Sequence, residues 1–251
     1  MIRNSLTVLL LSFAVAVGVF CAGNTETPTI VVATDPTYPP MEFRNDLGEL
    51  VGFDIELMEA VASAGEFDVQ FKSVPWDAIF GGLLNGSYDA VISAVTITEE
   101  RKKDFDFSAP YIKADQALVT ERAAEGVNSI ADLSGKKIGA LIGSAAQAAL
   151  DKLKDKYSIR LVSFRDQTEA VTDMLSGDVN AVVLDLTYAR ILTHERAYGN
   201  RLKIVAQPIA TEDFGIVVKK GNTEVLRRIN RGLKKAFKSG QLKQLEQKWF
   251  D

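Results

Sequence analysis

Two oppositely charged residues, Arg101 and Asp185, stand at or just beyond apolar segments of the sequence. The guanidinium of Arg101 can bind a carboxylate through two parallel hydrogen bonds. A helix expected to begin at Gly143–Ser144 offers a second anion site, because the first N–H groups of a helix have no acceptor within it. One carboxylate bound by both groups would bridge the two halves of the chain.

Asp185 ends the apolar segment "NAVVLD" and can accept a hydrogen bond from an ammonium group. The other two donors of that ammonium match the hydroxyl of Thr96 and the backbone carbonyl of Ser93. A carboxylate site combined with an ammonium site predicts that the chain binds a free amino acid.

Both charged residues also have a structural interpretation. Arg101 is expected in the first turn of a charged helix, where the helix dipole disfavours a cation but the preceding Glu99 and Glu100 can pair with it. Asp185 can be the N-cap of a helix that begins at Leu186. From local sequence alone, both interpretations stay open.

Short apolar strands and amphipathic helices alternate from Thr29 onward, which predicts an α/β fold with mostly parallel sheets. Strands are expected at residues 29–35, 68–74, 88–94, 136–142, 159–164, 180–185 and 214–221, with a hairpin over 41–53. Helices are expected at residues 54–65, 76–86, 143–153, 168–177 and 223–249, the last divided at Ser239–Gly240. Ligands of such sheets bind beyond the carboxyl ends of the strands. Asp35, the Ser93–Arg101 segment, Gly143–Ser144 and Asp185 all fall at such ends.

The first 21 residues are expected to be an export signal, because Arg3 precedes a short apolar run from Leu6 to Phe20; the structural alternative is an uncleaved membrane anchor. Cys21 resembles the acceptor cysteine of bacterial lipoproteins and is followed by a polar tether over residues 22–27. Phe20 departs from the small residue usual before that cysteine, so cleavage by an ordinary signal peptidase is the alternative.

The bulk composition excludes several other classes of function. Net charge is −4, which argues against general nucleic-acid binding. Cys21 is the only cysteine, so the folded part has neither disulfides nor a catalytic thiol. His194 is the only histidine and is expected at the surface. We therefore expect no metal and no cofactor.

Several segments resemble the periplasmic amino-acid-binding proteins of ABC importers, the polar and basic amino-acid type of the family 3 extracellular solute-binding proteins. They are "VVATDPTYPPMEF", "GELVGFDIELMEAVA", "YDAVISAVTITEERKKDFDFSAPY", "ADLSGKKIGALIGSAAQ", "NAVVLD" and "LKQLEQKWF". The third is the most specific, and the resemblance extends from about Thr29 to Asp251.

The resemblance implies the α/β type 2 periplasmic-binding-protein fold, with two lobes joined by two crossing hinge strands. Lobe 1 would comprise residues 28–112 and 212–251 and lobe 2 residues 114–209, with crossings near "YIKAD" and "IATED". The protein would be a monomer in the periplasm or cell envelope, tethered by lipid at Cys21. It would capture a free L-amino acid and deliver it to the membrane permease subunits of an ABC importer.

The family's ligand residues correspond to eleven positions here. Arg101, Ser144 and the Ala145 amide match carboxylate contacts, and Ser93, Ala94, Thr96 and Asp185 match ammonium contacts. Asp35, Tyr38, Trp76 and Leu141 match positions around the side chain of the ligand. Ala94 replaces a frequent Ser or Gly, and Leu141 stands where the glutamine binder has lysine.

The side-chain end of this expected site contains an acid, Asp35, and no assigned lysine or arginine. We therefore expect a polar or cationic side chain on the ligand rather than an acidic one. The alternative is that Asp35 caps a turn before Pro36 and does not contact the ligand.

Two other functions compete with transport. Some dehydratases that act on cyclic amino-acid precursors share the fold, and Asp35 or Asp185 could be their general acid. An acid paired with an ammonium stays ionised and donates protons poorly, so we expect a binding protein and not an enzyme. A ligand-binding component of a sensor is the third interpretation.

Overall fold

The structure is a computed structural model that describes residues 27–113, 115–194 and 197–250. The expected export signal, with Cys21 and most of the tether, lies outside these residues. Among the described helices, none combines the length and the apolar character needed to cross a membrane.

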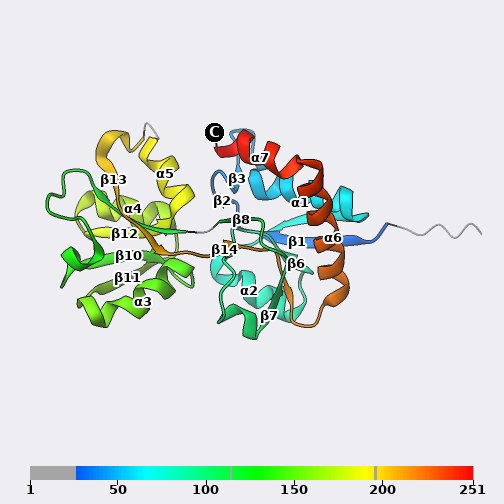
Figure 1. Ribbon diagram of the computed structural model, residues 1–251, viewed down its shortest axis with the longest axis horizontal. Helices are drawn as coiled ribbons and strands as arrows, with labels where there is room; N and C mark the ends of the chain where they lie inside the picture. The colour runs from blue at the N-terminus through cyan, green and yellow to red at the C-terminus, as the bar shows by residue number, and fades with distance from the viewer. Residues whose placement is uncertain (1–26, 114, 195–196, 251) are drawn as a thin grey trace, which may run out of the picture.

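The first sheet has the strand order β5-β1-β6-β15-β7. Its strands are β1 (Thr29–Thr34), β5 (Asp68–Ser73), β6 (Ala90–Val91), β7 (Phe105–Phe107) and β15 (Val217–Lys219). Helices α1 (Phe53–Gly65), α6 (Thr223–Ser239) and α7 (Gln241–Phe250) cover one face, and α2 (Trp76–Asn85) covers the other (Figure 1). Val32 and Ala33, adjacent on β1, belong to the cores on opposite faces.

The second sheet repeats this plan with the order β11-β10-β12-β9-β13. Its strands are β9 (Gln116–Glu121), β10 (Lys137–Leu141), β11 (Arg160–Phe164), β12 (Ala181–Asp185) and β13 (Leu202–Ala210). Helix α3 (Ala145–Tyr157) packs on one face, and α4 (Gln167–Ser176) and α5 (Leu186–His194) pack on the other. Short 3-10 helices lie at Ile130–Leu133 and Gly199–Arg201.

Two antiparallel strands, β8 (Ile112–Lys113) and β14 (Asp213–Phe214), run between the two sheets (Figure 1). We call the part built on the first sheet lobe 1 and the part built on the second sheet lobe 2. β8 falls within the first expected crossing and β14 begins at the last residue of the second, whereas the residue limits proposed for each lobe stay a prediction. A small antiparallel sheet of β2 (Thr37–Tyr38), β3 (Glu42–Arg44) and β4 (Leu50–Val51) adjoins α1 in lobe 1, and β3 and β4 form the expected hairpin.

Each sheet is mostly parallel in direction, as expected, but one strand in each, β15 in the first and β9 in the second, runs antiparallel to both of its neighbours. Two expectations about single strands were wrong in detail. The expected strand over 214–221 divides at Gly215, whose Cα lies so close to Ile97 that a Cβ would be 2.8 Å from the Ile97 Cδ1 atom. The segment 88–94 forms a strand only at Ala90–Val91.

The charged helix expected around Arg101 was also wrong, because residues Arg101–Lys103 form a single 3-10 turn. The apolar alternation of "FDF" begins strand β7 at Phe105 and leaves no room for a longer helix. A single turn aligns few peptide dipoles, so its first residues carry too little positive charge to repel a cation. The position of Arg101 therefore needs no compensation by Glu99 and Glu100.

Candidate functional site

All eleven residues proposed from the sequence line one pocket between the two lobes. They come from the ends of β1, β6, β10 and β12, from β2, from the starts of α2 and α3, and from the 3-10 turn at Arg101–Lys103. Nine further residues line the same pocket: Thr37, Glu42, Gln116, Ala146, Arg165, Asp166, Gln167, Val183 and Leu184. These residues thus lie near strand ends, where ligands of α/β sheets bind, and their contact with a ligand stays a prediction.

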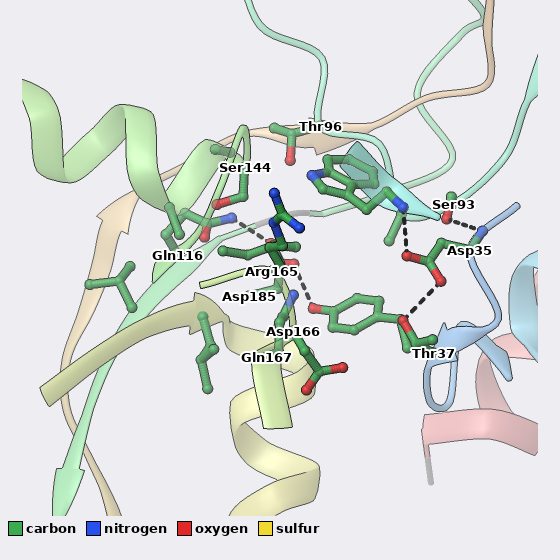
Figure 2. A pocket seen from close by; sticks show the side chains of 18 of the residues that line it. Asp35, Thr37, Ser93, Thr96, Gln116, Ser144, Arg165, Asp166, Gln167 and Asp185 are labelled. Atoms are coloured by element: carbon green, nitrogen blue, oxygen red, sulfur yellow. Dashed lines mark hydrogen bonds between the residues drawn. The ribbon is translucent and has the colours of Figure 1, made fainter. Parts of the chain in front are cut away.

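The Asp35 carboxylate is fixed within lobe 1. One of its oxygens accepts a hydrogen bond from the backbone N–H of Trp76 (2.8 Å), and the other accepts from the Thr37 hydroxyl (2.9 Å) (Figure 2). The Asp35 N–H donates in turn to Ser93 Oγ (3.0 Å). Asp35 thus holds the start of α2 and also lines the pocket, so a structural role and a contact with the ligand are compatible. Burial raises its pKa above the ordinary range.

Arg101 connects the two lobes. Its Nη1 donates to the carbonyl of Thr96 (2.8 Å) in lobe 1, and its Nη2 donates to the carbonyl of Gly143 (2.9 Å) in lobe 2. The guanidinium carbon lies 5.4 Å from the ring centroid of Trp76 and 4.9 Å from that of Phe80. Burial lowers its pKa to about 10, so the side chain stays cationic at neutral pH.

The surface interpretation of Arg101 is not supported, because the two acids before it have other partners. Glu99 pairs with Lys102 at 2.7 Å, and Glu100 pairs with Lys103 at 2.5 Å. These contacts leave the guanidinium directed at backbone carbonyls around the pocket.

Asp185 directs both carboxylate oxygens into hydrogen bonds at the pocket. Tyr38 Oη donates to Oδ2 (2.5 Å) and Gln116 Nε2 donates to Oδ1 (2.5 Å) (Figure 2). These partners differ from the helix N–H groups that an N-cap would bind. Burial raises the pKa of Asp185 to about 6, although the positive charge of Arg101 opposes the shift.

The turn between β10 and α3 supplies the N-terminus of a helix to the pocket. Ser144 is the N-cap, as expected, and its hydroxyl accepts from the Gln147 N–H (3.1 Å). Because Ala145 and Ala146 occupy the first turn, the helix itself offers no acceptors for their N–H groups. The carbonyls of Ile142 and Gly143 in the same turn accept from Trp76 Nε1 (3.0 Å) and from Arg101.

The end of β6 supplies the Ser93–Thr96 turn to the opposite wall. Ser93 Oγ donates to Glu42 Oε1 (2.8 Å), and the Ala94 N–H donates to Asp54 Oδ2 (2.7 Å). Ala94 adopts a positive φ of 44°, a conformation that is sparsely populated by residues other than glycine. These contacts hold the turn in place, and Thr96 directs its carbonyl to Arg101.

The sequence profile of the bacterial extracellular solute-binding proteins, family 3, matches residues 30–251. The chain belongs to this family. A probable histidine-binding protein of Neisseria gonorrhoeae is 32% identical over 87% of this chain and 82% of its own length. The L-cystine-binding protein TcyJ of Escherichia coli is 30% identical over 90% of this chain and 84% of its own length. An ancestral arginine-binding protein solved with arginine aligns with a TM-score of 0.83, at 38% identity, over 89% of this chain and 98% of its own.

The architecture of this family 3 solute-binding protein is thus the expected type 2 periplasmic-binding-protein fold, and most of the chain superposes on a solved arginine-binding protein. These three relatives are named as binding proteins, which supports the expectation of a non-enzymatic role. Their named ligands differ, so family membership fixes amino-acid binding and leaves the amino acid open.

The residues missed from the sequence of this solute-binding protein fall into two groups. Arg165 and Asp166 directly follow β11, and the strand-end rule that indicated Asp35 and Asp185 would have found them too. Gln116 opens β9 and Glu42 opens β3. Neither follows a parallel strand, and only the tertiary structure brings them to the pocket.

Proposed function

We propose that this solute-binding protein captures a free L-amino acid with a polar or cationic side chain and delivers it to the permease of an ABC importer. The observation that carries the proposal is one pocket in which Arg101 and the α3 N-terminus face the same space as Asp185. A zwitterion matches these groups, because its carboxylate accepts hydrogen bonds and its ammonium donates them.

The ligand's carboxylate takes the place that the Gly143 carbonyl occupies at Arg101. Arg101 then donates to a charged acceptor rather than a neutral one, which roughly doubles the strength of the hydrogen bond. Ser144 and the Ala145 N–H bind the same carboxylate from lobe 2. Binding energy from both lobes thereby stabilises the closed form.

The ligand's ammonium donates to Asp185, to the Thr96 hydroxyl and to the Ser93 carbonyl. Asp185 with pKa about 6 is ionised at neutral pH, and the ammonium stabilises that ionised form further. An acid held in this state is a poor proton donor, which favours binding over dehydration.

The side-chain end of the pocket favours a cation. Three carboxyl groups, those of Asp35, Asp77 and Asp166, lie close enough for the latter two to raise the pKa of Asp35. Arg165 also lines this region, which the sequence did not lead us to expect, and it offsets one of the three negative charges. Leu141 and Trp76 supply apolar surface for the stem of a long side chain.

Thermal unfolding of the protein without residues 1–21, in the presence of each of the twenty L-amino acids, tests the proposal. A tight ligand raises the unfolding temperature by mass action. We expect arginine, lysine, histidine or glutamine to give the largest rise. A larger rise with glutamate than with these four would contradict the side-chain assignment, and no rise with any of the twenty would contradict amino-acid capture.

Delivery to an importer requires a place in the cell envelope, and we propose a monomer tethered there by lipid at Cys21. Bacterial lipoprotein processing attaches more than one acyl chain, as stable anchoring requires. Metabolic labelling with a clickable fatty acid should mark the wild type and leave Cys21→Ser unmarked. An unlabelled wild type would mean that Phe20 prevents lipidation.

A further inference from the structure

Two fully buried acids lie behind the Ser93–Thr96 turn and have no role in the proposed function. Glu42 on β3 is 1% exposed and Asp54 on α1 is 0% exposed. Burying two carboxylates in one place is costly unless each is hydrogen-bonded and their charges are compensated. Their partners therefore indicate what the pair does.

Two of the four carboxyl oxygens of Glu42 and Asp54 accept hydrogen bonds from the Ser93–Thr96 turn and from a residue beside the hinge strand β8. Glu42 Oε1 accepts from Ser93 Oγ (2.8 Å), and Asp54 Oδ2 accepts from the Ala94 N–H (2.7 Å). The same Asp54 oxygen accepts from Tyr111 Oη (2.9 Å), which directly precedes the crossing strand β8. The pair thus contacts the expected ammonium site on one side and a hinge strand on the other.

The other two carboxyl oxygens of the pair have no such donor. Glu42 Oε2 and Asp54 Oδ1 are buried without any N–H or O–H donor from another described residue, and the two side chains are hydrogen-bonded to each other. Two carboxylates have only acceptors, so this contact requires a proton on one of them. Burial raises the pKa of both groups above the usual range, which favours retention of that proton.

Among the described residues, the groups that influence the pKa of Glu42 or Asp54 include no cation. The charged or titratable groups that influence Glu42 and Asp54 are Asp35 from the end of β1, Tyr38 from β2 and Tyr111 beside β8. The negative charge of Asp35 raises the pKa of Glu42 and so favours its protonated form. The two tyrosines are neutral, and the hydrogen bond from Tyr111 stabilises the Asp54 carboxylate. With the proton on Glu42, the Asp54 carboxylate accepts from Glu42, Ala94 and Tyr111.

We propose that Glu42 and Asp54 are positioning residues of the amino-acid site, and that they hold the Ser93–Thr96 turn by sharing one proton. They maintain Ala94 at its positive φ, so that the Ser93 carbonyl and the Thr96 hydroxyl face the ligand's ammonium. This inference rests on the proposed function for the identity of the ligand group, whereas the shared proton does not depend on it.

Amide substitutions test the shared proton, because an amide donates like a protonated acid and cannot ionise. Glu42→Gln donates to Asp54 and still accepts from Ser93. Asp54→Asn donates to Glu42 and still accepts from Ala94 and Tyr111. The double variant Glu42→Gln/Asp54→Asn places two NH₂ groups against each other, so one donor is buried without an acceptor.

Calorimetric titration with L-arginine at pH 7 should find both single variants within about threefold of the wild-type affinity. The double variant should bind about tenfold or more weakly, since a buried unpaired donor is expensive. Asp46→Asn, an acid-to-amide change on the exposed tip of the hairpin, controls for the loss of a charge. Equal affinity of the double and single variants would overturn the shared hydrogen bond.

Thermal unfolding without ligand gives a second readout that a purely steric role would not affect. Burial raises the pKa of Asp54 to about 7 and also raises that of Glu42, so the folded protein binds more protons than the unfolded chain and its stability falls as pH rises through neutrality. Glu42→Gln removes the titration, and its unfolding temperature should fall less than that of the wild type between pH 6 and pH 9. Parallel pH profiles of the two proteins would overturn the shared proton.

Failure of the proposed function gives a different pattern. If the wild type binds none of the twenty L-amino acids while the stability profiles differ as expected, the shared proton stands and the positioning role is overturned. If the wild type binds and Glu42→Gln loses as much affinity as Glu42→Leu, the pair acts through charge and the proposal is wrong.

Discussion

The two lobes supply the pocket with different kinds of wall. In lobe 1, Asp35 and Ser93 are fixed by hydrogen bonds within the same lobe. In lobe 2, Asp185 and the carbonyls of Ile142 and Gly143 accept hydrogen bonds that come partly from the other lobe. Lobe 1 is therefore a preformed surface, whereas the contacts of lobe 2 are completed by closure.

Three hydrogen bonds between the lobes have their donors in lobe 1 and their acceptors in lobe 2. Tyr38, Trp76 and Arg101 of lobe 1 donate, and Asp185, Ile142 and Gly143 of lobe 2 accept. A ligand carboxylate is a better acceptor for Arg101 than the Gly143 carbonyl, and it brings the N–H groups of α3 into use as well. This difference suggests that lobe 1 binds the amino acid first and that lobe 2 then closes over it.

The largest expected effect comes from lobe 1, through Arg101→Ala. We expect a loss of about 2–5 kcal/mol of binding free energy, because the ligand's carboxylate would be left in a buried site without its cation. Isothermal calorimetry measures the loss, and an unchanged circular-dichroism spectrum shows that the fold is retained. Affinity equal to that of the wild type would mean that the carboxylate binds elsewhere.

Residues that line the pocket could be predicted from the pattern of strands alone where they stand at the end of a strand, but not where they stand elsewhere. Asp35 and Asp185 stand at strand ends, where one rule of α/β sheets places ligand sites, and both line the pocket. Buried Glu42 has no such signal, since a lone glutamate between Met41 and Phe43 reads as the exposed position of a hairpin strand. Its burial depends on Ser93 and Asp54 from distant segments.

By contrast, the helix predicted around Arg101 does not form. The charge pattern of "TEERKK" fits a helix, but pairing of "FDF" with β15 ends it after one turn. The local sequence shows the preference of these residues for a helix, but it does not show the pairing of Phe105–Phe107 with a strand that lies far away in the chain. The tertiary structure decides between the two.

In lobe 2, the corresponding substitution is Asp185→Asn, for which we expect a smaller loss of about 1–3 kcal/mol. The ligand's ammonium keeps two acceptors in lobe 1, the Thr96 hydroxyl and the Ser93 carbonyl. Competition binding against the wild type measures the loss. A loss larger than that of Arg101→Ala would reverse the order of the two lobes.

The pH dependence of binding also separates the lobes. The pKa of Asp185 is about 6 in the unliganded protein, and the ammonium needs the ionised form. Affinity should therefore fall about tenfold between pH 7 and pH 5, because roughly one Asp185 in ten stays ionised at pH 5. Asp185→Asn should flatten that part of the profile, and a profile unchanged by the substitution would assign the titration to another group.

Asp35 in lobe 1 should contribute selectivity more than affinity. Asp35→Asn keeps an oxygen for the Trp76 N–H and removes the negative charge, so we expect a loss of about 1 kcal/mol for L-arginine. L-Glutamine, which is neutral, should lose less than half as much. Competition titrations with both ligands measure the difference, and equal losses would show that Asp35 only caps α2.

The smallest expected effect tests whether closure itself contributes. Trp76→Phe removes the indole N–H that donates to the Ile142 carbonyl (3.0 Å) but keeps a ring beside the Arg101 guanidinium. An exposed hydrogen bond of this kind is worth about 0.5 kcal/mol, so the dissociation constant should rise about twofold. Because the contact joins the two lobes, it exists only after closure. The rise should therefore appear in the dissociation rate measured by stopped flow, while the association rate, set by capture on lobe 1, stays the same. A change confined to the association rate would mean that Trp76 shapes the preformed surface of lobe 1 and that its bond to lobe 2 contributes nothing.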